Sequence, residues 1–209
     1  MRTAMALTLV VCLGTATSAS AQVAPPPAWT WSARLSVGFL VVSNDWSVSH
    51  PIYGGGGVTW ETFTGMFKHS LHLEGGLELR RSHFGVRGTL GVIPQRFTQD
   101  TPPKENDLKL LLAGLSAVVY PGATGAKIEP FLLAGAGAQK ASGDMDNTGF
   151  YLSTGAGLGA RLGSRVRLDA GLQVLRLKYT QIDLTPDIAK DVPIYPVSLF
   201  IGARLGLGG

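Results

Sequence analysis

Three residues that could form a hydrolytic site lie close together near residue 70. Ser70, His72 and Glu74 occupy alternate positions, so they would share one face of an extended strand. A serine, a histidine and a carboxylate are the groups of an esterase triad. Neighbouring same-face residues of a strand are about 6.6 Å apart, whereas a nucleophile and its base must approach within about 2.6–3.2 Å. The spacing therefore favours side chains that fill an interior, and it predicts no catalytic residue.

Two further patterns resemble ligand sites but are incomplete. Asp144, Asp146 and Asn147 carry oxygens that suit calcium, but the later Gly and the bidentate Glu of an EF-hand loop are missing. The run Gly54–Gly57 is not followed by the Gly-Lys-Ser/Thr of a phosphate-binding loop. We therefore expect a solvated loop at the first pattern, a flexible external loop at the second, and neither a metal nor a cofactor.

The composition excludes several classes of protein. Of the 209 residues, 28 are Gly and 12 are Pro, the two least favourable residues for a helix, which argues against a helical bundle. Hydrophobic residues make up 45 % and charged residues 15 %, the opposite of a disordered chain. The single Cys excludes a disulfide scaffold. A formal net charge of +4 without a basic run argues against a nucleic-acid partner.

Residues 1–21 are typical of a secretory signal peptide. Arg2 precedes an apolar run from Ala4 to Leu13, and Ala19 and Ala21 form the A-x-A pattern of a cleavage site. The run is too short to span a bilayer as a helix, which takes about 20 residues. We predict cleavage after Ala21, a Pro-rich leader over residues 22–30 and one exported domain over residues 31–209.

Beyond the leader, apolar residues alternate with small or polar ones, the pattern of a β-strand with two different faces. The clearest case is Leu71–Arg81, where leucines alternate with Glu74, Glu78 and Arg80. Eight such segments are predicted, over residues 31–42, 71–81, 84–97, 108–120, 128–141, 150–162, 165–182 and 195–207. In the segment 108–120 both faces are partly apolar, so the pattern does not decide its facing. The domain is therefore predicted to be all-β.

The polar faces of these segments combine charged side chains with many glycines. An eight-stranded barrel has an interior just wide enough for side chains to fill it, and Gly beside Arg and Glu suits such a narrow space. Soluble strand surfaces carry fewer glycines because Gly weakens a strand. We therefore predict a barrel whose apolar face meets lipid and whose interior holds nine charged residues: Arg34, Glu74, Glu78, Arg80, Arg87, Arg161, Arg167, Asp169 and Arg204.

The connections alternate in length. Those after the second, fourth and sixth segments are short and the others are longer, as in barrels with short periplasmic turns and longer extracellular loops. The polar stretches Thr98–Asp107, Ser142–Thr148 and Asp183–Ile194 are predicted as loops. Aromatic residues near strand ends are predicted to form interfacial girdles, namely Trp29, Trp31, Tyr120, Phe150, Tyr179 and Tyr195.

Residues 43–69 give no single prediction. Trp60, Phe63 and Phe67 recur at helical spacing, which would suit an amphipathic element at the outer interface. The same residues could equally extend the second strand. The structure of this stretch is therefore left open.

In layout, and in residues 129–137, 153–162, 165–171 and 197–205, the sequence resembles the small outer-membrane β-barrel family of the OmpA transmembrane domain, OmpX and the opacity proteins. The resemblance covers the mature chain. It implies an eight-stranded antiparallel up-and-down transmembrane barrel in the outer membrane, with a structural or surface-interaction role and no enzymatic activity. It also implies outer-membrane lipids, lipopolysaccharide and the barrel-assembly machinery as partners.

One departure and two alternatives accompany this resemblance. Such barrels usually end in an aromatic residue that the assembly machinery reads, whereas this sequence ends Leu207-Gly208-Gly209. Some barrels of this kind deacylate lipid A, so an outer-membrane lipid-modifying enzyme is one alternative, although the His-x-Ser segment of those deacylases is missing. A soluble periplasmic β-barrel that binds an apolar ligand is the other.

Overall fold

The computed structural model describes residues 28–41, 45–54, 57–100, 103–143, 147–180 and 191–208. The predicted signal peptide, its cleavage site at Ala21 and most of the predicted leader lie outside these residues. The described part forms eleven strands: β1 Thr30–Val41, β2 Asp45–Gly54, β3 Gly57–Phe67, β4 Ser70–Arg81, β5 Phe84–Asp100, β6 Pro103–Val119, β7 Ile128–Gly143, β8 Asn147–Arg161, β9 Val166–Thr180, β10 Asp191–Ile194 and β11 Val197–Gly208.

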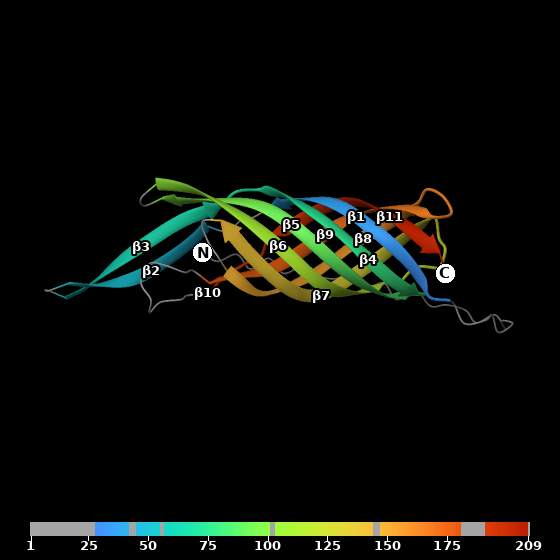
Figure 1. Cartoon of the computed structure of the whole chain (residues 1–209), viewed down its shortest axis with the longest axis horizontal. Coiled ribbons are helices and arrows are strands. Elements are labelled where there is room, and N and C mark those ends of the chain that lie inside the picture. Colours follow the sequence, from blue (N-terminus) through green and yellow to red (C-terminus); the bar gives the residue numbers. More distant parts are fainter. Residues whose placement is uncertain are drawn as a thin grey trace, which may run out of the picture.

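Eight of the strands form a closed antiparallel barrel (Figure 1). β4 to β9 pair in chain order, β11 pairs with β9, and β1 pairs with both β11 and β4. The ladder between β1 and β11 closes the barrel and satisfies the backbone groups of both edges, which a sheet in lipid requires. The predicted eight-stranded antiparallel barrel is confirmed, and its strands match the eight segments of alternating residues.

The two ends of the barrel differ. At the turn end, residues 82–83, 120–127 and 162–165 join neighbouring strands, and β1 begins there as β11 finishes. At the opposite end, which we call the loop end, the longer connections carry β2, β3 and β10. The β2–β3 hairpin extends well beyond the barrel at the loop end (left in Figure 1). The predicted longer connections are thus confirmed after β1 and β9. Between β5 and β6 and between β7 and β8 only residues 101–102 and 144–146 lie outside the strands, so most of the predicted loop Ser142–Thr148 belongs to β7 and β8.

Several predictions for the connections were wrong. Thr98–Asp107 was predicted as a loop, but β5 and β6 stay paired as far as Asp100 and Pro103. Of the two interpretations left open for Thr59–Phe67, the helical one is wrong, because β3 is a strand that pairs with β2. The other is partly confirmed, because Gly65–Phe67 pair with β5 and so continue the line of β4 along that strand. The predicted loop Asp183–Ile194 contains β10, which pairs with β9. These polar stretches were predicted as loops because a strand of the barrel wall needs an apolar face. The paired segments extend beyond the wall, where neither face needs to be apolar.

The outer face of the barrel is an apolar band. Exposure alternates along each strand, and leucines such as Leu35, Leu90 and Leu115 are 68 %, 70 % and 66 % exposed. Towards the loop end the outward side chains become charged, at Arg96, Lys109, Lys140 and Arg176. β5 has 17 residues, or about 58 Å at about 3.4 Å per residue, more than the apolar band of about 25 Å in such barrels. The longest strands therefore extend past the membrane. No helix in the described part of the chain is long and apolar enough to cross a membrane.

On several of the longer strands, the polarity of the two faces changes along the barrel axis. In the turn-end half, apolar side chains point outward and charged ones inward. Near the loop end of β6, Leu108 and Leu110 are buried while Lys109 between them is exposed. β9 repeats this pattern with buried Leu175 and Leu177 on either side of exposed Arg176. The loop-end stretches of β6 and β9 therefore have an apolar inner face and charged residues outside. At the loop ends of β1, β4 and β8 the outer face stays apolar, at Phe39, Leu71 and Phe150.

Candidate functional site

The turn-end half of the interior is organised around Glu78, whose side chain is completely buried. Arg87 donates to its Oε2 from Nε at 2.9 Å and from Nη2 at 2.7 Å. Arg204 Nη1 donates to Oε1 at 3.1 Å, and the Tyr120 hydroxyl donates to the same oxygen. One carboxylate from β4 is thus held by β5, β11 and the residue that follows β6.

Three more carboxylates complete this layer of charges. Arg34 Nη1 lies 2.6 Å from Glu74 Oε1, and Arg204 Nη2 lies 2.8 Å from Asp169 Oδ1. Glu129 accepts two hydrogen bonds from Arg80, at 2.6 and 2.8 Å, and another from Arg167. Each buried carboxylate therefore has at least one arginine partner, as burial of charge demands.

Aromatic rings cover several of these arginines. The guanidinium carbon of Arg80 lies 3.7 Å from the centre of the Tyr120 ring. Arg34 lies 4.9 Å from the ring of Phe200, and Arg87 lies 5.5 Å from that of Phe131. Such cation–π contacts favour a desolvated guanidinium. They also fill the space between the charged groups.

The nine residues predicted to point inward divide into two groups. Eight of them form ion pairs with one another or with Glu129, and their side chains are at most 14 % exposed. These are Arg34, Glu74, Glu78, Arg80, Arg87, Arg167, Asp169 and Arg204. The ninth, Arg161, lies at the end of β8, is exposed and forms no ion pair with the described residues.

Two members of the charged layer were missed from the sequence. Tyr120 was predicted to belong to an interfacial girdle, but that prediction is wrong because its side chain is fully buried among Glu78, Arg80 and Arg204. Glu129 was not singled out as an interior charge. It shares a face of β7 with Gly135 and Gly137, and this combination of a charge with glycines on one face is the same pattern that predicted the other interior charges. Of the other predicted girdle residues, Trp29, Trp31, Phe150 and Tyr195 are exposed, whereas the side chain of Tyr179 lies outside the described part.

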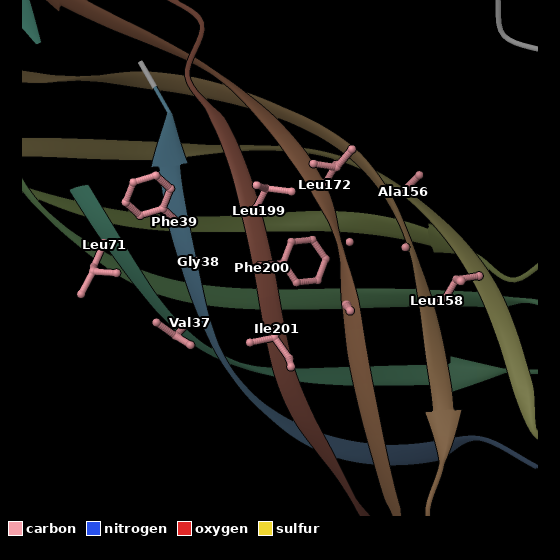
Figure 2. Close-up of a pocket in the computed structure, with 13 residues that line it drawn as sticks. Val37, Gly38, Phe39, Leu71, Ala156, Leu158, Leu172, Leu199, Phe200 and Ile201 are labelled. Carbon is pink, nitrogen blue, oxygen red and sulfur yellow. The ribbon is translucent and has the colours of Figure 1, made fainter. Parts of the chain in front are cut away.

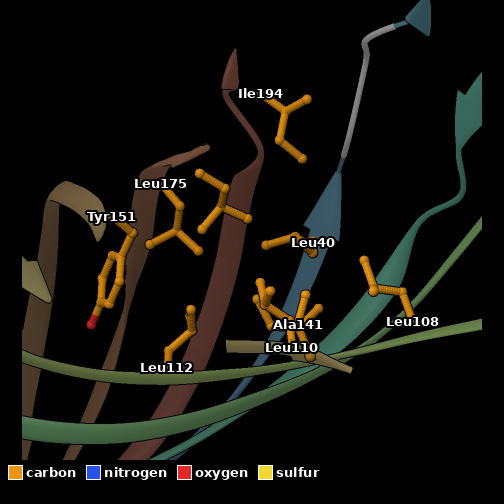
Figure 3. Close-up of a cluster of buried hydrophobic side chains, with 10 residues drawn as sticks. Leu40, Leu108, Leu110, Leu112, Ala141, Tyr151, Leu175 and Ile194 are labelled. Carbon is orange, nitrogen blue, oxygen red and sulfur yellow. The ribbon is translucent and has the colours of Figure 1, made fainter. Parts of the chain in front are cut away.

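The loop-end half of the interior contains an apolar cluster (Figure 3), beside buried polar side chains such as Gln95 and Gln139. Its buried cluster draws side chains from β1, β5, β6, β7, β8 and β9 and from the end of β10, and none is more than 6 % exposed. The members are Leu40, Ile93, Leu108, Leu110, Leu112, Ala141, Tyr151, Leu175, Leu177 and Ile194. The sequence predicted no such cluster, because an inside-out barrel was expected to be polar within along its whole length.

The esterase-like triad is not assembled. The Ser70 hydroxyl donates to Gln95 Oε1 at 3.2 Å instead of contacting His72. His72 Nε2 lies 3.9 Å from Glu74 Oε2 and has no hydrogen-bond partner among the described residues. No nucleophile is therefore paired with a base at this place. The described residues also contain no group of three or more His, Cys, Asp or Glu side chains that could hold a metal, and Asp144 and Asp146 lie outside them.

A broad depression lies on the outer wall (Figure 2). It measures about 800 Å³ and lies over Ala156 and Ala170, between larger side chains such as Phe39, Leu172 and Ile201. Every residue that lines it is apolar or Gly, so it offers no group for acid–base or nucleophilic chemistry. It belongs to the lipid-facing band.

Comparison with known proteins supports this fold. No family model and no curated protein matches the sequence. Among solved structures, Neisserial surface protein A (NspA) is similar with a TM-score of 0.54 at 16 % identity, over 85 % of this chain and 96 % of that one. Outer membrane protein AlkL, solved in lipid bilayers, is similar with a TM-score of 0.53 at 16 % identity, over 93 % of this chain and 98 % of that one. With its closed wall and apolar outer face, the chain has the fold of the small eight-stranded outer-membrane β-barrels.

Proposed function

We propose that this protein is a non-enzymatic outer-membrane barrel with a closed interior, and that it acts through surfaces at its loop end. The filled interior carries this proposal. Leu110 in the apolar layer has no exposed surface, and Arg87 in the charged layer is 1 % exposed. A water-filled pore would leave such side chains exposed to solvent. The two layers act instead as consecutive plugs.

The loop end offers the surface for interaction. The β2–β3 hairpin projects from it (Figure 1), and β3 is tied to the wall by pairing of Gly65–Phe67 with residues of β5. Long loops of such barrels face the outside of the cell. NspA, which is similar in fold, is by its name a surface protein. The projecting strands would therefore meet molecules outside the cell.

Lipopolysaccharide is the proposed lipid partner. Four exposed cations lie on the outer face towards the loop end, on four different strands: Lys109, Lys140, Arg176 and Arg96, the last of which pairs with the exposed Asp107. They stand where the apolar band ends, which is the level of the lipid headgroups. Arg and Lys at that level suit phosphate groups, because guanidinium and ammonium groups form charge-assisted hydrogen bonds with phosphate.

Cell fractionation and single-channel recording test the proposal together. We expect the protein in the outer-membrane fraction, with unboiled samples migrating differently from boiled ones in a gel. In planar bilayers we expect no steady conductance, and protease added outside cells should cut within residues 42–69. Recovery in the soluble periplasm, a stable open channel, or protection of this segment from protease would contradict the proposal.

The enzymatic alternative has its own test. Lipid A from cells that produce wild-type protein, the His72→Ala variant or no protein is compared by mass spectrometry. Because Ser70 and His72 are not paired, we expect the same acylation pattern in all three. Loss of acyl chains with wild-type protein, restored by His72→Ala, would show an enzyme.

A further inference from the structure

The turn end of the barrel opens into a cavity of about 290 Å³ with an unusual set of charges. Five arginines and one carboxylate line it, namely Arg80, Arg161, Arg165, Arg167, Arg204 and Glu78. Small-molecule sites start at about 300 Å³, so the cavity has the size for a compact ligand. Its charge points to an anion.

The acidic groups near the cavity are already committed. Glu78 is held by Arg87, Arg204 and Tyr120. Glu129 lies fully buried, paired with both Arg80 and Arg167. Across the whole charged layer, five arginines share four carboxylates. The layer therefore carries a net positive charge, without Arg161 and Arg165 being included.

Arg161 and Arg165 add to this excess at the mouth. Both are exposed, and neither forms an ion pair within the described part of the chain. Deeper in, Arg204 is 4 % exposed and its Nε has no hydrogen-bond partner among the described residues. Arg204 already pairs with Glu78 and Asp169, so the uncompensated charge is the net charge of the buried layer. Net positive charge in a poorly solvated layer is costly, and an anion bound at its mouth relieves that cost. Guanidinium groups match phosphate oxygens in geometry as well as in charge.

We propose that this cavity binds a phosphate group, either that of a membrane phospholipid or that of a small free anion. Trp31 also lines the cavity and is 47 % exposed, which places an aromatic side chain of interfacial type beside it. Arg161 and Arg165 capture the phosphate at the mouth, and Arg80 and Arg167 lie behind them. The site is independent of the loop-end surface and of the proposed surface role.

Calorimetric titration of the full barrel in an uncharged detergent tests this site. The probes are inorganic phosphate and dihexanoyl phosphatidylglycerol below its micelle concentration, at constant ionic strength. The double variant Arg161→Gln/Arg165→Gln is compared with Arg81→Gln/Lys127→Gln, which removes the same charge from the same end but no residue that lines the cavity. Circular dichroism and gel mobility show whether each variant is folded.

We expect saturable binding that the first variant weakens at least about tenfold, the effect of losing charge-assisted hydrogen bonds, and that the second leaves unchanged. Tighter binding of the lipid identifies a headgroup site, and binding of phosphate alone identifies a site for a free anion. Absence of saturable binding by either probe, or equal weakening in both variants, would overturn the proposal.

Discussion

Leu110 and Leu115 lie on the same strand, β6, and face opposite sides of the barrel wall. Leu110 has no exposed surface, whereas 66 % of Leu115 is exposed. The first packs inside the loop-end half against the apolar cluster, and the second belongs to the lipid-facing band. One strand therefore places leucines in two different apolar environments, the packed interior at the loop end and the lipid around the barrel. The interior changes from apolar to charged along this strand, while the outer face next to lipid stays apolar at Leu111 and Leu115.

Truncation of Leu110 should be more costly than truncation of Leu115. Leu110→Ala leaves a cavity among packed side chains, so we expect a loss of about 2–5 kcal/mol in the free energy of unfolding. Leu115→Ala leaves a space that lipid tails fill, so the cavity contribution is missing. Urea unfolding in lipid vesicles, followed by tryptophan fluorescence, measures both. Equal losses would show that Leu110 also contacts lipid.

Removal of the Glu78 charge should strongly destabilise the charged layer. Glu78→Gln leaves Arg87 and Arg204 without their shared carboxylate in a buried site, and breaking such a pair costs about 3–5 kcal/mol. The matched control is Asp107→Asn, because the Arg96–Asp107 pair joins side chains that are 67 % and 81 % exposed. Such pairs contribute less than about 1 kcal/mol. A similar small loss for both variants would mean that water reaches Glu78.

Gly157 allows the Phe131 ring to lie against the wall. A Cβ at this position would come within 2.5 Å of Phe131 Cζ and 2.6 Å of the Ala170 carbonyl oxygen. We expect Gly157→Ala to lower the free energy of unfolding by about 1–3 kcal/mol through overpacking. At Gly163 nothing lies within 4 Å of such a Cβ, so Gly163→Ala serves as the control. A neutral effect at Gly157 would show that the ring is free to move away.

The sequence predicted the barrel because alternation with period two reports directly which residues share a face. β4 is the clearest example, with Leu73 and Leu77 outside and Glu74 and Glu78 inside. Alternation alone does not say which face meets lipid. The glycines beside charged residues supplied that information for the turn-end half.

The loop-end half was missed because its inward face is apolar, whereas the inward face of the turn-end half is charged. Around Lys109 the leucines on one face continue inward while Leu111 and Leu115 on the other face point to lipid, so both faces look apolar in the sequence. Tyr120 was misplaced for a related reason. A tyrosine at a strand end suits the interface, and only the three-dimensional closeness of Glu78 and Arg204 shows that its hydroxyl is used inside.

The change of polarity along β6 is tested most directly by proton NMR contacts between lipid chains and selectively methyl-labelled leucines, with the protein in lipid nanodiscs. We predict strong cross-relaxation from acyl-chain protons to the methyl groups of Leu115 and none to those of Leu110. For the backbone amide of Lys109 we predict cross-relaxation with water protons. Acyl-chain contacts to Leu110, or their absence at Leu115, would contradict the opposite facing of the two leucines.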